Sequence, residues 1–236
     1  MFATIVLVGV WILLGVPVAL VAIPWTIVTR KILPMYRAAI VVVRTGIRCA
    51  GIRVEPVWRE PLDPGQRYIF LANHVSNLDP PILIPLLPLP VAVILKRSLM
   101  KIPILGWAMR LAGYIPVDRD GRVESAMESA EIAKRTLASG IHILSFPEGT
   151  RSRDGRLQPF KKGPFYMAHE SSAPVVPISI YGTESMMRKG SIRIFPATAH
   201  VIFHAPIQPR DYRTREDLME AVHAAVASGL PDQMRP

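Results

Sequence analysis

A histidine and an aspartate stand five residues apart within residues 73–80, which directly follow an apolar stretch. Such a pair is suited to general-base chemistry. When the Asp79 carboxylate accepts a hydrogen bond from one imidazole nitrogen of His74, the other nitrogen can take a proton from an alcohol. On a regular helix, residues five apart point about 140° away from each other, so the pair needs a turn between its members. Ser76 and Asn77 favour such a turn.

A purely structural role explains the same residues. Asp79 also suits the start of a helix that begins with Pro80, and His74 is then a buried residue at the end of a strand. The spacing alone leaves both interpretations open.

A second polar cluster occupies residues 146–152 and contains Glu148, Gly149, Thr150 and Arg151. Glu148 and Arg151 are suited to hold the polar part of an acceptor, because a guanidinium can donate two parallel hydrogen bonds to a phosphate. A surface turn with a local Glu–Arg ion pair, which contributes little to stability, explains the same residues.

Both clusters follow apolar runs of strand length. Such runs predict strands at residues 52–58, 67–72, 91–95, 114–117, 141–146, 175–181 and 200–204. Helices are predicted at residues 81–87, 104–111, 123–139, 163–170 and 216–228, the last supported by Thr214 and Asp217 at the spacing of a capping box. This alternation predicts an α/β fold in which helices flank a mixed, largely parallel sheet.

The first fifty residues predict a membrane-associated segment of two helices. Residues 1–29 carry no charged side chain, and Arg30 and Lys31 end this uncharged run. The run is long enough to cross a bilayer. The start lacks the positive charge of a cleaved signal sequence. Because Pro17 and Pro24 can kink a helix, we favour a helical hairpin that dips into one leaflet over a single full span.

The second helix is expected at residues 33–52. Arg37, Arg44 and Arg48 share one face of it, so it reads as an interfacial amphipathic helix on the cytoplasmic face of the cell membrane. A core-packing helix with a solvated basic edge is the alternative. We therefore expect an anchoring segment at residues 1–50 and a catalytic domain at residues 51–236.

Composition supports a membrane partner. Lys and Arg number 28 against 18 for Asp and Glu, giving a formal net charge of +10 on a chain that is 50% hydrophobic. This combination suggests an anionic membrane surface. Nucleic acid is not expected, since aromatic residues make up only 7% and no recognition motif accompanies the charge. Cys49 is the only cysteine, which excludes an intramolecular disulfide, and no cluster of metal-ligating residues stands out.

Four blocks of the sequence together resemble the lysophosphatidate (1-acylglycerol-3-phosphate) acyltransferase family over most of residues 56–182. The blocks are residues 74–79, 101–119, 146–152 and 176–182. In the first block Val75 and Asn77 occupy positions that are often polar and aromatic in the family. These departures leave His74 and Asp79 intact and bear on how the acceptor or the acyl chain is held.

The resemblance implies a direct acyl transfer. His74 would remove the proton of the sn-2 hydroxyl of 1-acylglycerol 3-phosphate, and that oxygen would attack the thioester of acyl-CoA or acyl carrier protein to give phosphatidic acid. Asp79 would orient His74 and stabilise its protonated form. The resemblance implies no cofactor, metal or acyl-enzyme.

The resemblance also assigns substrate-binding residues. Glu148 would lie near the glycerol of the acceptor, on the loop that continues through Gly149 and Thr150. Arg151 would neutralise the phosphate, with Lys96 and Arg119 as weaker candidates.

Two other functions stay open. One is acyl transfer to glycerol 3-phosphate, a lyso-aminolipid or another lysophospholipid. The other is a noncatalytic membrane protein that binds anionic lipid, although the intact His74–Asp79 and Glu148–Arg151 sets argue against it.

Overall fold

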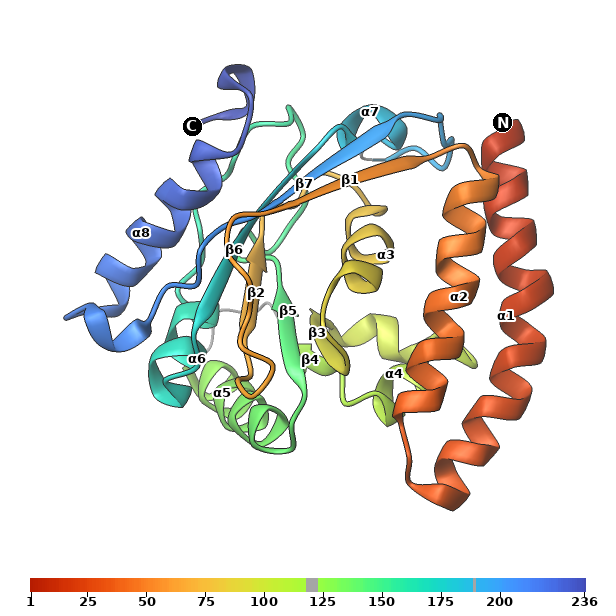
Figure 1. Ribbon diagram of the computed structural model, residues 1–236, viewed down its shortest axis with the longest axis horizontal. Helices are drawn as coiled ribbons and strands as arrows, with labels where there is room; N and C mark the ends of the chain where they lie inside the picture. Colours follow the sequence, from red (N-terminus) through yellow and green to blue (C-terminus); the bar gives the residue numbers. More distant parts are fainter. Residues whose placement is uncertain (118–122, 189) are drawn as a thin grey trace.

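The computed structural model describes residues 1–117, 123–188 and 190–236, with the backbone alone at residues 123–129. Among these residues seven strands form one sheet in the order β1-β7-β6-β2-β5-β3-β4 (Figure 1). The strands are β1 Arg53–Trp58, β2 Ile69–Ala72, β3 Val91–Lys96, β4 Ile115–Val117, β5 His142–Ser145, β6 Val175–Tyr181 and β7 Thr198–Phe203. Neighbours are parallel except for the antiparallel pair β6–β7. The expected mixed, largely parallel sheet is confirmed.

Helices cover both faces of the sheet (Figure 1). Those of residues 51–236, predicted above to be catalytic and called the catalytic part below, are α3 Asp79–Leu83, α4 Leu105–Leu111, α5 Val123–Ala138, α6 Gly163–Ser171, α7 Thr183–Met186 and α8 Arg215–Ser228. Short 3₁₀ helices lie at η1 Ile84–Leu86, η2 Arg97–Lys101, η3 Pro209–Asp211 and η4 Asp232–Met234. Every predicted strand and helix is present within a few residues of its expected bounds. The short elements η2, α7, η3 and η4 were not predicted, because they are too brief to show a periodic pattern.

Strand β2 lies inside the sheet and its side chains alternate between two hydrophobic cores. Ile69 and Leu71 belong to the core beneath α5, α6 and α8, whereas Phe70 and Ala72 belong to the core on the other face. All four residues are fully buried. A strand covered on both faces reads as a continuous apolar run, and this burial fixes the position from which the following residues leave the sheet.

The N-terminal residues form two antiparallel helices, α1 Phe2–Thr29 and α2 Leu33–Cys49 (Figure 1). Helix α1 continues through Pro17 and Pro24, so the reversal within residues 1–29 that the prolines suggested is absent from this described segment. The chain reverses instead at Arg30, which adopts a left-handed conformation with φ 56°. The hairpin is therefore built from α1 and α2 together.

The hairpin packs onto the catalytic part of the chain. Ala3 and Leu7 of α1 share a hydrophobic core with strand residues of the sheet, and the N–H of Ile194 donates a 2.8 Å hydrogen bond to Thr4 Oγ1. In α2, the Tyr36 hydroxyl lies 2.6 Å from the carbonyl oxygen of Val91. The hairpin therefore holds a defined position relative to the sheet.

Candidate active site

The two polar clusters meet at one edge of the sheet. Strands β2 and β5 are parallel neighbours, with Leu71 paired to Ser145. The residues that follow each strand consequently lie side by side, and this carboxyl edge is where parallel α/β sheets usually bind ligands. The sequence clusters at residues 73–80 and 146–152 occupy it.

His74 and Asp79 are in direct contact. His74 Nδ1 lies 2.8 Å from Asp79 Oδ2, and the two side chains are 15% and 0% exposed. The expected turn is present, since the N–H of Asp79 donates to the carbonyl oxygen of Ser76 at 3.3 Å. The spacing therefore brings the two side chains together through a turn, as predicted.

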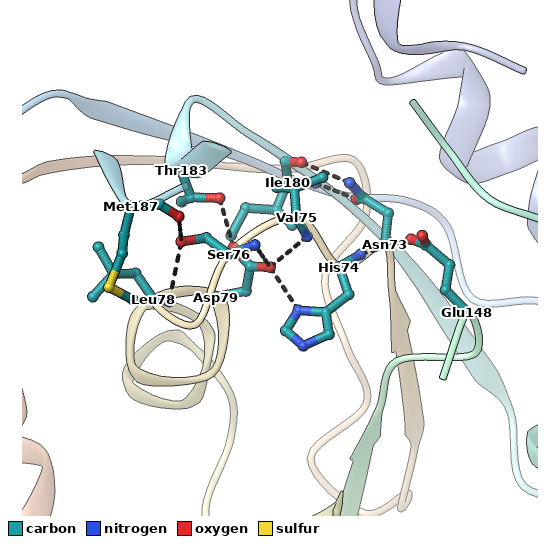
Figure 2. A network of polar contacts seen from close by, with 10 residues as sticks. All are labelled: Asn73, His74, Val75, Ser76, Leu78, Asp79, Glu148, Ile180, Thr183 and Met187. Carbon is teal, nitrogen blue, oxygen red and sulfur yellow. Dashed lines mark hydrogen bonds and ion pairs between the residues drawn. The ribbon is translucent and has the colours of Figure 1, made fainter. Parts of the chain in front are cut away.

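Asp79 is held by donors from several directions (Figure 2). The backbone N–H groups of Val75 and Ser76 each donate to Oδ2 at 2.8 Å. The hydroxyl of Thr183 donates to Oδ1 at 2.5 Å. These bonds, with the one from His74, offset the cost of burying a carboxylate. Although Asp79 begins α3, its carboxylate turns back to the preceding loop, so the capping interpretation does not describe these contacts.

The surroundings of His74 define its chemistry. An ionised carboxylate only accepts hydrogen bonds, so the network assigns the proton to Nδ1 and a lone pair to Nε2. Nε2 points away from Asp79 (Figure 2). The imidazole stacks on the ring of Phe146, with centroids 4.2 Å apart and planes inclined by 29°. His74 is thus arranged to accept a proton from a hydroxyl at Nε2.

Glu148 contacts the main chain of His74. Its Oε1 accepts a 2.7 Å hydrogen bond from the His74 N–H, and the Ser152 N–H donates to the His74 carbonyl oxygen at 2.8 Å. Glu148 is 5% exposed. Burial raises the pKa of its carboxyl to about 8, an effect that the backbone hydrogen bonds from His74 and Gln158 oppose and the nearby Asp79 charge reinforces. Residues 146–152 therefore hold the backbone of His74 through two hydrogen bonds.

The rest of that loop is only partly exposed. Gly149 has φ 72°, a conformation that favours glycine, and a Cβ placed there would lie 3.0 Å from Lys161 Cε. Thr150 is exposed and Arg151 is half-buried. Lys161 thus adds a cation beside the Glu148–Arg151 loop, whereas the adjacent Lys162 pairs with Glu216 at 2.9 Å.

Of the two weaker candidates for phosphate binding, the structure describes only Lys96. Lys96 is exposed at the carboxyl end of β3, and β3 is the parallel neighbour of β5. It therefore lies on the same edge of the sheet as the two clusters. Arg119 lies outside the described residues.

Sequence reasoning missed the contributions of Thr183 and Asn73. Thr183 follows β6, which runs parallel to β2. The signal that could have found it is its position as a polar residue just after a third strand that runs in the same direction as β2 and β5. The side chain of Asn73 bonds both the N–H and the carbonyl oxygen of Ile180, each at 2.8 Å. It thereby ties the catalytic loop to β6. Among the described residues, no group of three or more His, Cys, Asp or Glu side chains is arranged to hold a metal ion.

A fold of this type with a histidine–aspartate pair at its carboxyl edge has known relatives. The family model described as Acyltransferase matches residues 53–181. The chain therefore belongs to the acyltransferase family.

Individual relatives are similar over most of the chain. A 1-acyl-sn-glycerol-3-phosphate acyltransferase from Limnanthes douglasii is 32% identical over 72% of this chain and 62% of its own length. The Homo sapiens 1-acyl-sn-glycerol-3-phosphate acyltransferase alpha is 32% identical over 71% of this chain and 59% of its own length. The chain thus spans about three fifths of each of these relatives.

A solved structure covers nearly the whole chain. The 1-acyl-sn-glycerophosphate (LPA) acyltransferase PlsC from Thermotoga maritima matches with a TM-score of 0.79 and 26% identity, over 97% of this chain and 93% of that one. The similarity includes the N-terminal hairpin, because so little of either chain lies outside it.

Proposed function

We propose that this protein transfers a fatty acyl group to the sn-2 hydroxyl of 1-acylglycerol 3-phosphate and so produces phosphatidic acid. The observation that carries the proposal is the 2.8 Å contact between His74 Nδ1 and a fully buried Asp79. The names of the similar proteins supply the substrate class.

In the proposed reaction, His74 Nε2 takes the proton of the acceptor hydroxyl as its oxygen attacks the thioester carbonyl of acyl-CoA or acyl carrier protein. The C–S bond then breaks, the thiolate leaves with a proton from His74, and the new ester is complete. Asp79 keeps the proton on Nδ1 and stabilises the imidazolium that forms between the two steps. The scheme uses only protein side chains and the two substrates, with no cofactor.

Substrate binding is assigned to the loops at the same edge of the sheet. Arg151 is proposed to bind the acceptor's phosphate, with Lys96 and Arg119 as additional cations, because a guanidinium matches phosphate geometry. The loop at Gly149 and Thr150 would border this site. Glu148 is proposed to meet the acceptor's glycerol through Oε2, which has no hydrogen-bond partner among the described residues.

The hairpin is proposed to hold the domain on the cytoplasmic face of an anionic cell membrane. Helix α1 is the described helix long and apolar enough to cross a bilayer. However, Gly15 of α1 packs near Val42 of α2, which places the neighbouring Arg44 level with the middle of α1. A perpendicular span would carry into hydrocarbon both Arg44 and the Pro85 carbonyl oxygen to which its guanidinium donates, and an arginine at the centre of a bilayer costs about 3 kcal/mol. A hairpin embedded in one leaflet avoids this cost.

The substrate assignment is tested with purified protein in lipid. Labelled 1-acylglycerol 3-phosphate, glycerol 3-phosphate, a lyso-aminolipid and a lysophospholipid with a larger headgroup would each be offered with acyl-CoA and with acyl carrier protein. We expect 1-acylglycerol 3-phosphate to give the highest kcat/KM. Faster transfer to another acceptor would replace the assigned substrate, and lipid binding without transfer to any acceptor would favour the noncatalytic function.

A further inference from the structure

Exposed apolar side chains gather on one short segment of the catalytic part. Outside the hairpin, the large hydrophobic residues described as exposed are Val57, Trp58, Leu99, Ile102, Ile104, Leu105, Trp107, Ile192 and Phe195. The five from Leu99 to Trp107 belong to η2, α4 and the turn between them. We call these five side chains the η2–α4 surface. Their exposed fractions lie between 41% and 57%.

The segment is folded so that it presents these side chains outward. Met100, 7% exposed, is its inward-facing anchor, and the Arg110 guanidinium donates to the Met100 carbonyl oxygen at 3.0 Å. A Cβ on Gly106 would lie 2.1 Å from that same carbonyl oxygen. Only glycine therefore lets α4 fold this closely against η2, and the exposure of the surface follows from a specific backbone packing.

Two features indicate what covers this surface. Helix α4 packs against the apolar helix α1, so the η2–α4 surface continues the apolar surface of the hairpin. Lys96 and Lys101, both exposed, flank it at the two ends of η2. Tryptophan beside lysine is the residue combination typical of the boundary between lipid headgroups and acyl chains.

The position of the surface connects it with the active site. Helix η2 starts directly after β3, whose parallel neighbour β5 leads into the Glu148 loop. A leaflet that received the η2–α4 surface would therefore meet the domain along the edge that carries His74.

We propose that the η2–α4 surface inserts into the headgroup region of an anionic leaflet and forms a second membrane contact of this chain, distinct from the hairpin. A lipid leaflet is favoured over a second copy of the chain because the surface adjoins α1 and is bordered by lysines. The proposal concerns membrane docking alone and does not require that the acyl-transfer assignment be correct.

The test reads insertion directly, without acyl transfer. In a Cys49→Ser background, single cysteines would replace Trp107 or Ile102 and carry an environment-sensitive fluorophore. The full-length protein would be bound to phosphatidylcholine vesicles containing phosphatidylglycerol and acyl-chain spin-labelled lipid. Asp232, whose side chain is 90% exposed, begins η4 close to the C-terminus and supplies the matched negative control. The C-terminus lies on the far side of the molecule from α1 (Figure 1). Leu13, 72% exposed on α1, supplies the positive control.

We expect blue-shifted emission and strong quenching at positions 107 and 102, comparable to position 13, and no change at position 232. We also expect weaker quenching in vesicles without phosphatidylglycerol, because the lysines lose their anionic partner. Absence of quenching at both 107 and 102 overturns the proposal, whatever position 13 shows. A blue shift that depends on protein concentration but not on spin-labelled lipid would assign the surface to a second copy, which also overturns it.

Discussion

Asp79 is fully buried, and the hydrogen-bond donors around its carboxyl group explain how that group is held in place. Its two oxygens receive the loop N–H groups of Val75 and Ser76, the Thr183 hydroxyl and the His74 imidazole. A carboxylate supported on both oxygens has a fixed orientation, and it passes that orientation to the imidazole. In this account Thr183 positions the catalytic pair without touching the substrate.

Replacing Thr183 with valine tests this positioning role. Thr183→Val keeps the side-chain shape but removes the 2.5 Å hydrogen bond to Asp79 Oδ1. A hydrogen bond to a charged group contributes about 1.5–3 kcal/mol, so we expect kcat to fall by on the order of 10-fold or more, with KM nearly unchanged. Thr183→Ser, which keeps the hydroxyl, should restore most of the turnover. Equal losses in the two variants would show that the hydroxyl is not the important group.

The burial of Glu148 predicts a pH-dependent stability. Its carboxyl pKa rises from 4.5 to about 8 in the folded protein, so between these values the folded state binds the proton that the unfolded state has lost. The free energy of unfolding should therefore decrease as pH rises through this range, by about 1.4 kcal/mol per pH unit at most. Glu148→Gln cannot ionise and should flatten this decline, measured as Tm against pH in detergent. Parallel Tm curves for both proteins would contradict the assignment.

Sequence reasoning recovered some of these residue contacts and missed others for identifiable reasons. The His74–Asp79 contact depends on a local turn, and local spacing was sufficient to predict it. The Glu148 side chain points toward the backbone N–H of His74, which belongs to the loop after the neighbouring strand β2. Thr183 lies 104 positions along the chain from Asp79. Such contacts follow from strand order, which one sequence does not display.

Among the secondary-structure elements, α1 and α2 show how close packing defines the hairpin. Trp11 Nε1 donates to the Val43 carbonyl oxygen at 3.4 Å. A Cβ on Gly46 would lie 2.3 Å from that indole nitrogen. Gly46 therefore lets the Trp11 ring lie against the backbone of α2.

Gly46→Ala should separate the two helices. The added methyl group collides with Trp11, and overpacking of this kind costs about 1–3 kcal/mol. We expect a lower Tm in detergent, with partial recovery when Trp11→Ala makes room. Gly9→Ala on α1, where nothing lies within 4 Å of the added carbon, is the matched control and should be neutral or stabilising. A Tm for Gly46→Ala equal to that of Gly9→Ala would contradict the packing.

The prediction of helices and strands succeeded where the apolar pattern of the sequence was long. It failed where tertiary packing decided the course of the backbone. The strand over residues 175–181 was predicted with the bounds that β6 has, because its apolar run is continuous. Pro17 and Pro24 were given too much weight as signs of a bend. A helix packed along a neighbouring helix tolerates proline, and α1 continues through both residues.

At the scale of the whole molecule, the hairpin and the catalytic part share one hydrophobic core. The N-terminal end of α1 is bound to the loop before β7 through Thr4 and Ile194, and α2 returns the chain to β1 beside it. Both chain ends of the hairpin thus adjoin the catalytic part, as the proposed placement in one leaflet requires.

Accessibility labelling tests that placement. Single cysteines at Phe2 and Lys31, in a Cys49→Ser background, should both react with a membrane-impermeant maleimide from the cytoplasmic side. Both positions are exposed in the structure, so the protein itself does not hide them. Reaction of either position only from the opposite side would establish a span and exclude the hairpin placement.

The central claim is that His74, oriented by Asp79, is the base for acyl transfer, and His74→Ala tests it most directly. The variant would be compared with wild type for transfer of a labelled acyl chain to 1-acylglycerol 3-phosphate in vesicles, with matched Tm and vesicle binding as proof of folding. Because a positioned base contributes roughly 100- to 10,000-fold, we expect turnover to fall by that factor. Folded, membrane-bound His74→Ala protein with wild-type turnover would contradict the account.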